Sequence, residues 1–366
     1  MLTALTVIAI LVFLIVVHEL GHFIVAKLSG VKVEEFGIGY PPRAFTFGVF
    51  HGTEYTLNWI PFGGFVRLFG DSGEKEHGRG SLTDSPRWKQ AGILVAGVAM
   101  NALAAWFLFT LAFHSGILQP VSADAIPSGE HTLLIVSEVV SGSPASAAGL
   151  RPGDEILGIA DAHGERIIDA PTPDSIVAFV RTHAGEPLTV SYKSVGEERQ
   201  TTITPSQGVL MQEAGQPALG VALVLVATVS EGWITAAQSG LSETLAAFKS
   251  VSLNLGAFFG GFFTGTADLS QVVGPVGIVS YVGAASQNGA GAVLMLAALI
   301  SVNLAIINLL PIPALDGGRL VVLAIEAATR KSAPRLVVRL LNTAGIALII
   351  FLMVTVTYHD IGRLLT

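Results

Sequence analysis

The strongest constraint on this chain is a polar pentapeptide at the end of its first apolar segment. His18-Glu19-Leu20-Gly21-His22 follows an apolar run from Leu2 to Val17. Positions i and i+4 share one face of a helix, so both histidines can reach the same metal ion. Glu19 can then orient and deprotonate a water molecule at that ion. A polar helix end at a membrane surface is the alternative, but two histidines and a carboxylate are costly in hydrocarbon without a partner. The pattern therefore predicts a metalloprotease site inside a transmembrane helix.

Composition places the chain among membrane proteins that carry a soluble part. Of its 366 residues, 51% are hydrophobic and 13% are charged, whereas soluble domains average about 25% charged residues. A formal net charge of −7 gives no basic surface, which argues against a nucleic-acid partner. Cysteine is absent, so disulfides and thiolate metal sites are excluded. Any zinc must therefore be held by histidine, aspartate or glutamate.

Four apolar segments are long enough to span a membrane, at about 2–28, 91–118, 292–310 and 336–358. The first has no basic N-terminal region and no small-residue cleavage site, so we expect a retained helix, not a signal peptide. Between the first two spans, residues 33–70 alternate like paired strands around a turn at His51-Gly52-Thr53. Such a hairpin is tolerated at membrane depth only within protein or a water-filled cavity. An ordinary soluble loop domain remains the alternative there.

The segment 124–229 is predicted to be a soluble, β-rich insertion. Ser143-Pro144-Ala145 precedes Ala148-Gly149-Leu150 and then Gly153-Asp154, a pattern that resembles PDZ domains of the bacterial type. PDZ domains bind an extended peptide at a sheet edge, although such a module can also serve only as a spacer. Residues 233–263 then carry an apolar stripe at helical spacing, which suits a helix lying on the membrane surface. A fifth span is the competing interpretation of that segment.

The distribution of lysine and arginine predicts the orientation of the chain, because cytoplasmic loops carry the basic excess. The loop between the first two spans holds eight basic residues: Lys27, Lys32, Arg43, Arg67, Lys75, Arg79, Arg87 and Lys89. Five more lie around the short loop between the third and fourth spans: Arg319, Arg330, Lys331, Arg335 and Arg339. We therefore expect both termini and the PDZ insertion outside the cytoplasm. His18 is about 16 residues from the outer end, or roughly 24 Å along a helix, which puts the site towards the cytoplasmic face.

A catalytic zinc site needs three protein ligands and one open position. The third ligand must lie at the cytoplasmic end of another span, where the chain reads Asn308-Leu309-Leu310-Pro311-Ile312-Pro313-Ala314-Leu315-Asp316-Gly317-Gly318. Two prolines cannot continue a helix, so the chain becomes extended after Leu310 and can carry Asp316 to the first helix. An aspartate in an ordinary Asp-Gly turn is the alternative. Depth and the need for a ligand favour Asp316 as the third ligand.

Together, H-E-L-G-H in the first span and N-x-x-P-x-P-x-L-D-G from Asn308 to Gly317 resemble the site-2 protease family of intramembrane zinc metalloproteases. The resemblance extends over essentially the whole chain, with a single PDZ domain between the second and third spans. It implies one zinc ion held by His18, His22 and Asp316, with Glu19 as catalytic base. Further residues that the resemblance implies in substrate binding are Gly63, Gly64, Phe65, Asn308, Pro311 and Pro313. Around Gly97 and Asn101 the chain departs from the family pattern A-G-P-x-x-N by lacking the proline.

The expected fold is a polytopic α-helical membrane protein with four transmembrane helices, a membrane-associated β-hairpin and an inserted PDZ domain. Its expected parts are 1–118 (with the hairpin at 33–70), the PDZ domain at 124–229, a surface helix and linker at 230–290, and 291–366. The resemblance implies a protein of the bacterial inner membrane that cuts single-span membrane proteins, such as anti-sigma factors or remnant signal peptides. Membrane lipid and a peptide ligand of the PDZ domain are further expected partners. A catalytically silent scaffold that binds peptides is the main alternative; a zinc carrier lacks the relay of polar residues it would need.

Overall fold

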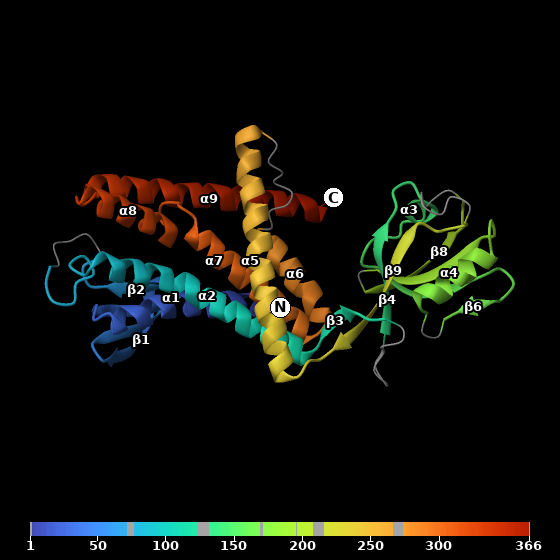
Figure 1. Ribbon diagram of the computed structural model, residues 1–366, viewed down its shortest axis with the longest axis horizontal. Coiled ribbons are helices and arrows are strands. Elements are labelled where there is room, and N and C mark those ends of the chain that lie inside the picture. Colours follow the sequence, from blue (N-terminus) through green and yellow to red (C-terminus); the bar gives the residue numbers. More distant parts are fainter. Residues whose placement is uncertain are drawn as a thin grey trace. The chain divides into compact units, whose positions relative to one another are not determined.

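The computed structural model describes residues 2–71, 77–122, 132–168, 171–194, 196–207, 216–265 and 274–365. The chain divides into two compact units (Figure 1). One consists of Met1–Ser115 with Glu231–Thr366, and the other of Gly116–Ser230.

Long apolar helices form the framework of the first unit. They are α1 (Leu2–Leu28), α2 (Arg87–Ser115), α7 (Ala290–Leu309) and α9 (Arg335–Leu365). Four segments are long and apolar enough to cross a membrane: Leu2–Leu28, Arg87–Ser115, Ala290–Leu309 and Leu336–Gly362. Helix α2 packs against both α1 and α7. The prediction that the second span runs to residue 118 is wrong at its end, because Gly116 has φ +92° and the next residues form β3 (Ile117–Pro120).

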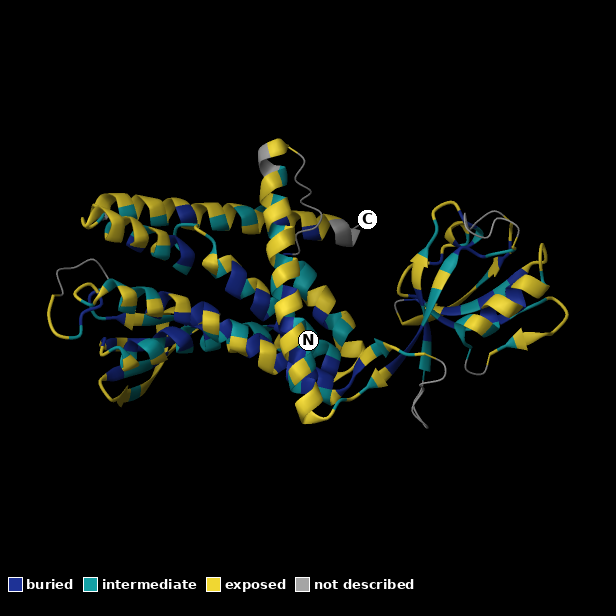
Figure 2. Cartoon of the chain, in the orientation of Figure 1, coloured by how far each residue is buried: buried dark blue, intermediate teal, exposed yellow. Residues whose placement is uncertain are grey.

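Apolar side chains remain uncovered along the outer faces of these helices. Figure 2 shows that most of α9 is exposed. Its exposed residues include large apolar side chains: Leu340, Ile346, Ile350, Phe351 and Val354. A contiguous apolar surface of this kind is unfavourable in water and is expected where lipid replaces water.

The hairpin of β1 (Val33–Phe50) and β2 (Thr53–Leu68) turns at His51 and Gly52, both with positive φ. Both strands bend, so the first half of β1 pairs on two sides, for example Phe36 with Tyr55 and with Val66. Residues 64–68 pair with this half of β1 only, and no other strand in the described part of the chain pairs with them. The hairpin therefore presents residues 64–68 as an open sheet edge.

Three further helices complete the first unit: α5 (Trp233–Thr264), α6 (Pro275–Gln287) and α8 (Asp316–Thr329). Helix α5 runs steeply across α2 (Figure 1). At the crossing, Trp106 donates a hydrogen bond to the carbonyl of Ala237 at 2.9 Å, and Gly240 lies directly against Thr110. A Cβ at Gly240 would lie 2.7 Å from the Thr110 hydroxyl, so only glycine permits this close approach.

The second unit has its own hydrophobic core beneath a seven-stranded sheet in the order β3-β9-β4-β5-β7-β8, with β6 paired to β5. Its strands are β3, β4 (Thr132–Val139), β5 (Glu155–Ala160), β6 (Arg166–Ile167), β7 (Leu188–Ser194), β8 (Glu197–Ile203) and β9 (Val221–Val229). Two helices, α3 (Pro144–Ala147) and α4 (Pro173–Thr182), accompany the sheet. Ser143 caps α3, Pro144 occupies its first turn, and a glycine turn leads into β5. The Ser-Pro-Ala…Gly-Asp pattern thus forms a short helix, a turn and a strand.

Candidate metal centre

Three polar side chains meet inside the first unit. His18 Nε2 lies 3.1 Å from Asp316 Oδ2, and His22 Nε2 lies 3.2 Å from the same oxygen. The two Nε2 atoms are 3.2 Å apart. His18 and His22 are buried, and the Asp316 side chain is 14% exposed. The structure therefore brings together all three predicted metal ligands.

Their spacing fits a single zinc ion. Ligand atoms bonded to one tetrahedral zinc at about 2.0–2.1 Å lie about 3.3 Å from one another. The three separations here are 3.1, 3.2 and 3.2 Å. Two imidazole nitrogens and a carboxylate oxygen are also a donor set that zinc prefers. In the described part of the chain these three residues therefore make a site that zinc fits without rearrangement.

Asp316 reaches this position because the chain breaks sharply after α7. Leu310 is extended, Ala314 has φ +77°, and Asp316 begins α8. A Cβ at Gly317 would lie 2.2 Å from the carbonyl oxygen of Leu310, so this turn can fold only around glycine. Burial alone would raise the pKa of the Asp316 carboxyl, but hydrogen bonds to His18 and His22 outweigh burial and hold that pKa below its usual range.

Helix α2 supplies the surroundings of both histidines. The Nδ1 atom of His22 is 2.7 Å from the carbonyl oxygen of Ile93, and Nδ1 of His18 is 3.3 Å from the Asn101 amide nitrogen. Gly97 lies against the two rings, where a Cβ would be 2.5 Å from His22 Nε2 and 2.6 Å from His18 Cε1. Gly21 in turn lets α1 approach the backbone of Ala96. Small residues on both helices therefore make room for the centre.

Glu19 faces the open edge of the hairpin. Gly64 lies against it, since a Cβ there would be 3.1 Å from Glu19 Cγ. Gly63 has φ +137° and a Cβ on it would overlap the Tyr40 ring, so both glycines allow a close fit. The predicted catalytic base and two of the predicted substrate-binding glycines are thus neighbours.

The remaining predicted substrate-binding residues lie outside the ligand cluster. The Phe65 ring covers Gly37 of β1 and lies under the Arg67 guanidinium, 5.9 Å from it. Asn308 is half-buried in the last turn of α7, and Pro311 is exposed just beyond it. Pro313 packs against α9, where a Cβ at Gly345 would lie 2.0 Å from the Pro313 carbonyl oxygen.

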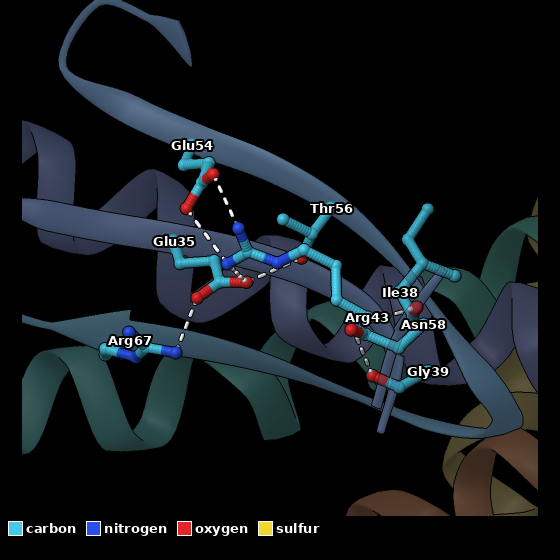
Figure 3. A network of polar contacts seen from close by, with 8 residues as sticks. All are labelled: Glu35, Ile38, Gly39, Arg43, Glu54, Thr56, Asn58 and Arg67. Carbon is cyan, nitrogen blue, oxygen red and sulfur yellow. Dashed lines mark hydrogen bonds and ion pairs between the residues drawn. The ribbon is translucent and has the colours of Figure 1, made fainter. Parts of the chain in front are cut away.

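A buried ionic network holds the hairpin in shape (Figure 3). The Glu35 carboxylate is 3% exposed and pairs with Arg67 at 2.5 Å and with Arg43 at 3.0 Å. It also accepts a hydrogen bond from the Thr56 hydroxyl at 2.7 Å, while Arg43 binds Glu54 through both of its terminal nitrogens. Since these residues come from different strand segments, the network fixes residues 64–68 to the rest of the sheet.

Sequence reasoning missed the residues that support the ligands from a distance. Ile93, Gly97 and the role of Asn101 depend on how α1 packs against α2, which no local pattern specifies. Helix α8 was also not predicted. Its signal was available in the apolar residues at helical spacing after Asp316, such as Leu320, Leu323 and Ala324.

A second group of possible ligands lies in the Gly116–Ser230 unit. His183 Nε2 is 3.6 Å from Asp161 and 3.8 Å from Glu165. A hydrogen bond to the Phe179 carbonyl and the two carboxylates raise the pKa of His183, while backbone N–H groups lower the pKa of Asp161 against the effect of burial. Both shifts favour the charged forms, so an ion pair accounts for this cluster.

Two histidines one helical turn apart, an adjacent glutamate and a carboxylate from another apolar helix–turn segment define the class of zinc-dependent peptidases built among membrane helices. Residues 6–352 match peptidase family M50. The chain therefore belongs to this family of zinc metalloproteases, which contains the site-2 proteases, and the resemblance seen in the sequence is confirmed.

Individual relatives of known sequence align with this chain along almost their whole length. A Clostridium perfringens protein named as a zinc metalloprotease is 36% identical, with 95% of each chain covered. One of the same designation from Agrobacterium fabrum is 30% identical, covering 98% of this chain and 95% of its own. The zinc metalloprotease RasP of Geobacillus kaustophilus is 28% identical, covering 96% and 95%. The PDZ domain of an SdrC-like protein from Listeria monocytogenes is 20% identical, covering 25% of this chain and 85% of its own, with a TM-score of 0.20.

Proposed function

We propose that this chain is an intramembrane endopeptidase that hydrolyses peptide bonds within the transmembrane segments of single-span membrane proteins. The observation that carries the proposal is that His18 and His22, on the span-length helix α1, meet Asp316, which follows the span-length helix α7, within 3.2 Å. Glu19 lies next to His18 on the same helix. A protease for soluble substrates has no need to bury its metal ligands among such helices.

One zinc ion would be held by His18, His22 and Asp316, leaving one position open. A zinc ion held there would supply Lewis-acid chemistry, polarising the scissile carbonyl and lowering the pKa of a bound water to about 7. Glu19 takes the proton of the attacking water and returns it to the leaving amine. Glu19 lies next to the ligands and against Gly64 of the hairpin edge. It could therefore make both proton transfers to a substrate bound at that edge.

Residues 64–68 are the proposed docking edge for the substrate. A peptide bond within a helix is shielded by its own hydrogen bonds, so the substrate must unwind before it is cut. Pairing with an open strand edge replaces the lost hydrogen bonds. Gly64 and Phe65 lie on this edge, and Gly63 directly precedes it. Asn308 lies in the last turn of α7, and Pro311 and Pro313 lie on the irregular stretch that leads from it to Asp316. We assign these six residues to holding the unwound segment.

The proposed location is the bacterial inner membrane, with both termini and residues 124–229 outside the cytoplasm and the site towards its cytoplasmic side. The basic loops support this orientation. The steep crossing of α5 over α2 supports a surface position for residues 233–263, because a helix that crosses a spanning helix steeply runs near the membrane plane. Exposed aromatic residues on the hairpin support its contact with lipid: Phe45, Phe47, Phe50 and Trp59.

The Gly116–Ser230 unit is proposed to be a PDZ domain that binds a peptide. Its core contains a small apolar cavity lined by Ile176 of α4, by Val221 and Leu223 of β9, and by Leu150. PDZ domains bind an extended peptide by adding it to a sheet edge. Substrates that retain little mass outside the membrane, such as trimmed anti-sigma factors or remnant signal peptides, are the proposed class.

The test is cleavage of a single-span test substrate, truncated outside the membrane, by co-expressed native protein and by Glu19→Gln. The variant keeps the size of the side chain and all three ligands but removes the base. We expect a product with the native protein alone. Equal results with both proteins would contradict the proposal and favour the peptide-binding scaffold, to be tested by PDZ peptide binding.

A further inference from the structure

Asn101 lies in the middle of α2 and is completely buried. Its backbone carbonyl accepts a hydrogen bond of 2.8 Å from Ser301 of α7, and its amide nitrogen lies 3.3 Å from Nδ1 of His18. The amide oxygen Oδ1 has no hydrogen-bond partner among the described residues. A buried acceptor without a partner is costly, so its presence beside a metal ligand needs a physical reason.

The tautomer that His18 needs as a zinc ligand supplies that reason. A neutral imidazole that binds zinc through Nε2 carries its proton on Nδ1, and this N–H must donate to an acceptor. His22 has such an acceptor, the Ile93 carbonyl oxygen at 2.7 Å. In the described part of the chain, the only polar side chain within hydrogen-bond distance of His18 Nδ1, apart from the ligand cluster, is Asn101. With the amide nitrogen turned towards Nδ1–H, two donors would face each other.

We propose that Asn101 is a positioning residue for the zinc site, which accepts the Nδ1–H hydrogen bond of His18 through Oδ1. A half-turn of the amide about its Cβ–Cγ bond exchanges nitrogen and oxygen, which are nearly equal in size. That turn satisfies the unpaired oxygen and the imidazole proton with one hydrogen bond. The proposal rests on the proposed zinc site and adds that α2 fixes the tautomer and ring orientation of both histidines.

Asn101 also contacts α7, through its backbone and independently of its side-chain amide. Ser301 binds the backbone of Asn101, so the contact ties α2 to α7, and α7 leads into the turn that carries Asp316. Asn101 therefore contacts both α1, which carries the two histidines, and α7, which leads to Asp316. Outer partners of this kind typically change metal affinity by about 10–100-fold when they are removed.

The experiment measures zinc affinity of the full-length protein in detergent by competition with a chromophoric chelator. Asn101→Leu has the same branching and the same number of side-chain heavy atoms but no acceptor. Asn101→Ala is a second, smaller variant without an acceptor, so it cannot overfill the site. Asn101→Asp restores the acceptor as a carboxylate. Ser301→Ala is the matched control, because it removes a hydrogen bond to the same residue but leaves the amide in place.

We expect Asn101→Leu and Asn101→Ala to weaken zinc binding by about 10-fold or more, and Asn101→Asp and Ser301→Ala to retain the native affinity. Native affinity in both acceptor-free variants would overturn the proposal. Equal weakening in Asn101→Asp would also overturn it, since that variant keeps both the shape of the side chain and an acceptor oxygen. If the native protein itself binds no zinc, the proposed function fails together with this inference. If the native protein binds zinc but the Asn101 variants do not behave as expected, this inference fails and the proposed function stands.

Discussion

His18, His22 and Asp316 would each destabilise an apolar helical bundle if buried alone, because an unpaired polar group in such surroundings costs several kcal/mol. Here each is within 3.2 Å of the other two, and the second nitrogen of each histidine faces a polar atom of α2. These three side chains can therefore be buried together, but none of them can be buried alone. Removing one member leaves the others without compensation.

Gly97→Ala tests how closely α2 encloses the centre. A Cβ at Gly97 would lie 2.5 Å from His22 Nε2, the atom assigned to zinc, so the ring must shift. We expect zinc affinity to fall by about 10-fold or more, the range seen when ligand orientation is lost, in the same chelator competition. Gly92→Ala is the control on the same helix, because nothing lies within 4 Å of its new methyl group. Equal zinc affinity in both variants would show that the rings are not confined by α2.

At this scale the sequence predicted what a local pattern can specify. The H-E-x-x-H spacing alone places His18, Glu19 and His22 on one turn of helix. Asp316 required an argument from membrane depth, since nearly 300 residues separate it from His18. Asn101 and Gly97 could not be assigned a role, because their importance arises from the packing of α1 on α2.

Among the elements, the hairpin and the α7–α8 turn have the closest relation to the centre. Neither is regular: the hairpin bends so that one half of β1 pairs on both sides, and the turn closes on Gly317 and Gly318. Alternating residues predicted strands, but the bend and the open edge follow from tertiary packing against α1. The sequence did not predict the Glu35 network either, because glutamate and arginine are common on strands that face solvent.

Glu35→Gln tests whether the hairpin edge serves substrate binding. The change keeps the shape of the side chain but removes the charge that holds Arg67 and Arg43. We expect cleavage of the test substrate to fall by about 5- to 10-fold, since one buried charge-assisted contact contributes about 1.5 kcal/mol or more. Zinc affinity should stay unchanged because the network touches none of the ligands. Unchanged cleavage would show that the edge of residues 64–68 does not contribute to substrate binding.

At the scale of the whole molecule, the chain combines one unit whose helices expose apolar side chains and one unit with its own hydrophobic core. Hydropathy predicted four span-length helices at the positions where the structure has them, but the predicted ends differ from the observed ends by a few residues. Helix ends depend on capping and on the strand that follows, as at Gly116, and hydropathy does not encode them.

The orientation can be tested directly because the native chain contains no cysteine. A single cysteine at Gln200→Cys or Lys331→Cys, both exposed, is then the sole thiol. In spheroplasts we expect a membrane-impermeant maleimide to label Gln200→Cys at once and Lys331→Cys only after permeabilisation. The native protein is the blank. The reverse pattern would invert the proposed topology, in which the basic loops face the cytoplasm.

The central claim is that this chain cuts a peptide bond inside a transmembrane segment by zinc-dependent hydrolysis. The most direct measurement is mass spectrometry of the products formed from a single-span substrate by purified protein in lipid vesicles. The account predicts a new terminus within the apolar segment, formed by the native protein, absent with Glu19→Gln, and lost and restored with removal and return of zinc. Cleavage only outside the apolar segment, or cleavage that persists in Glu19→Gln, would contradict it.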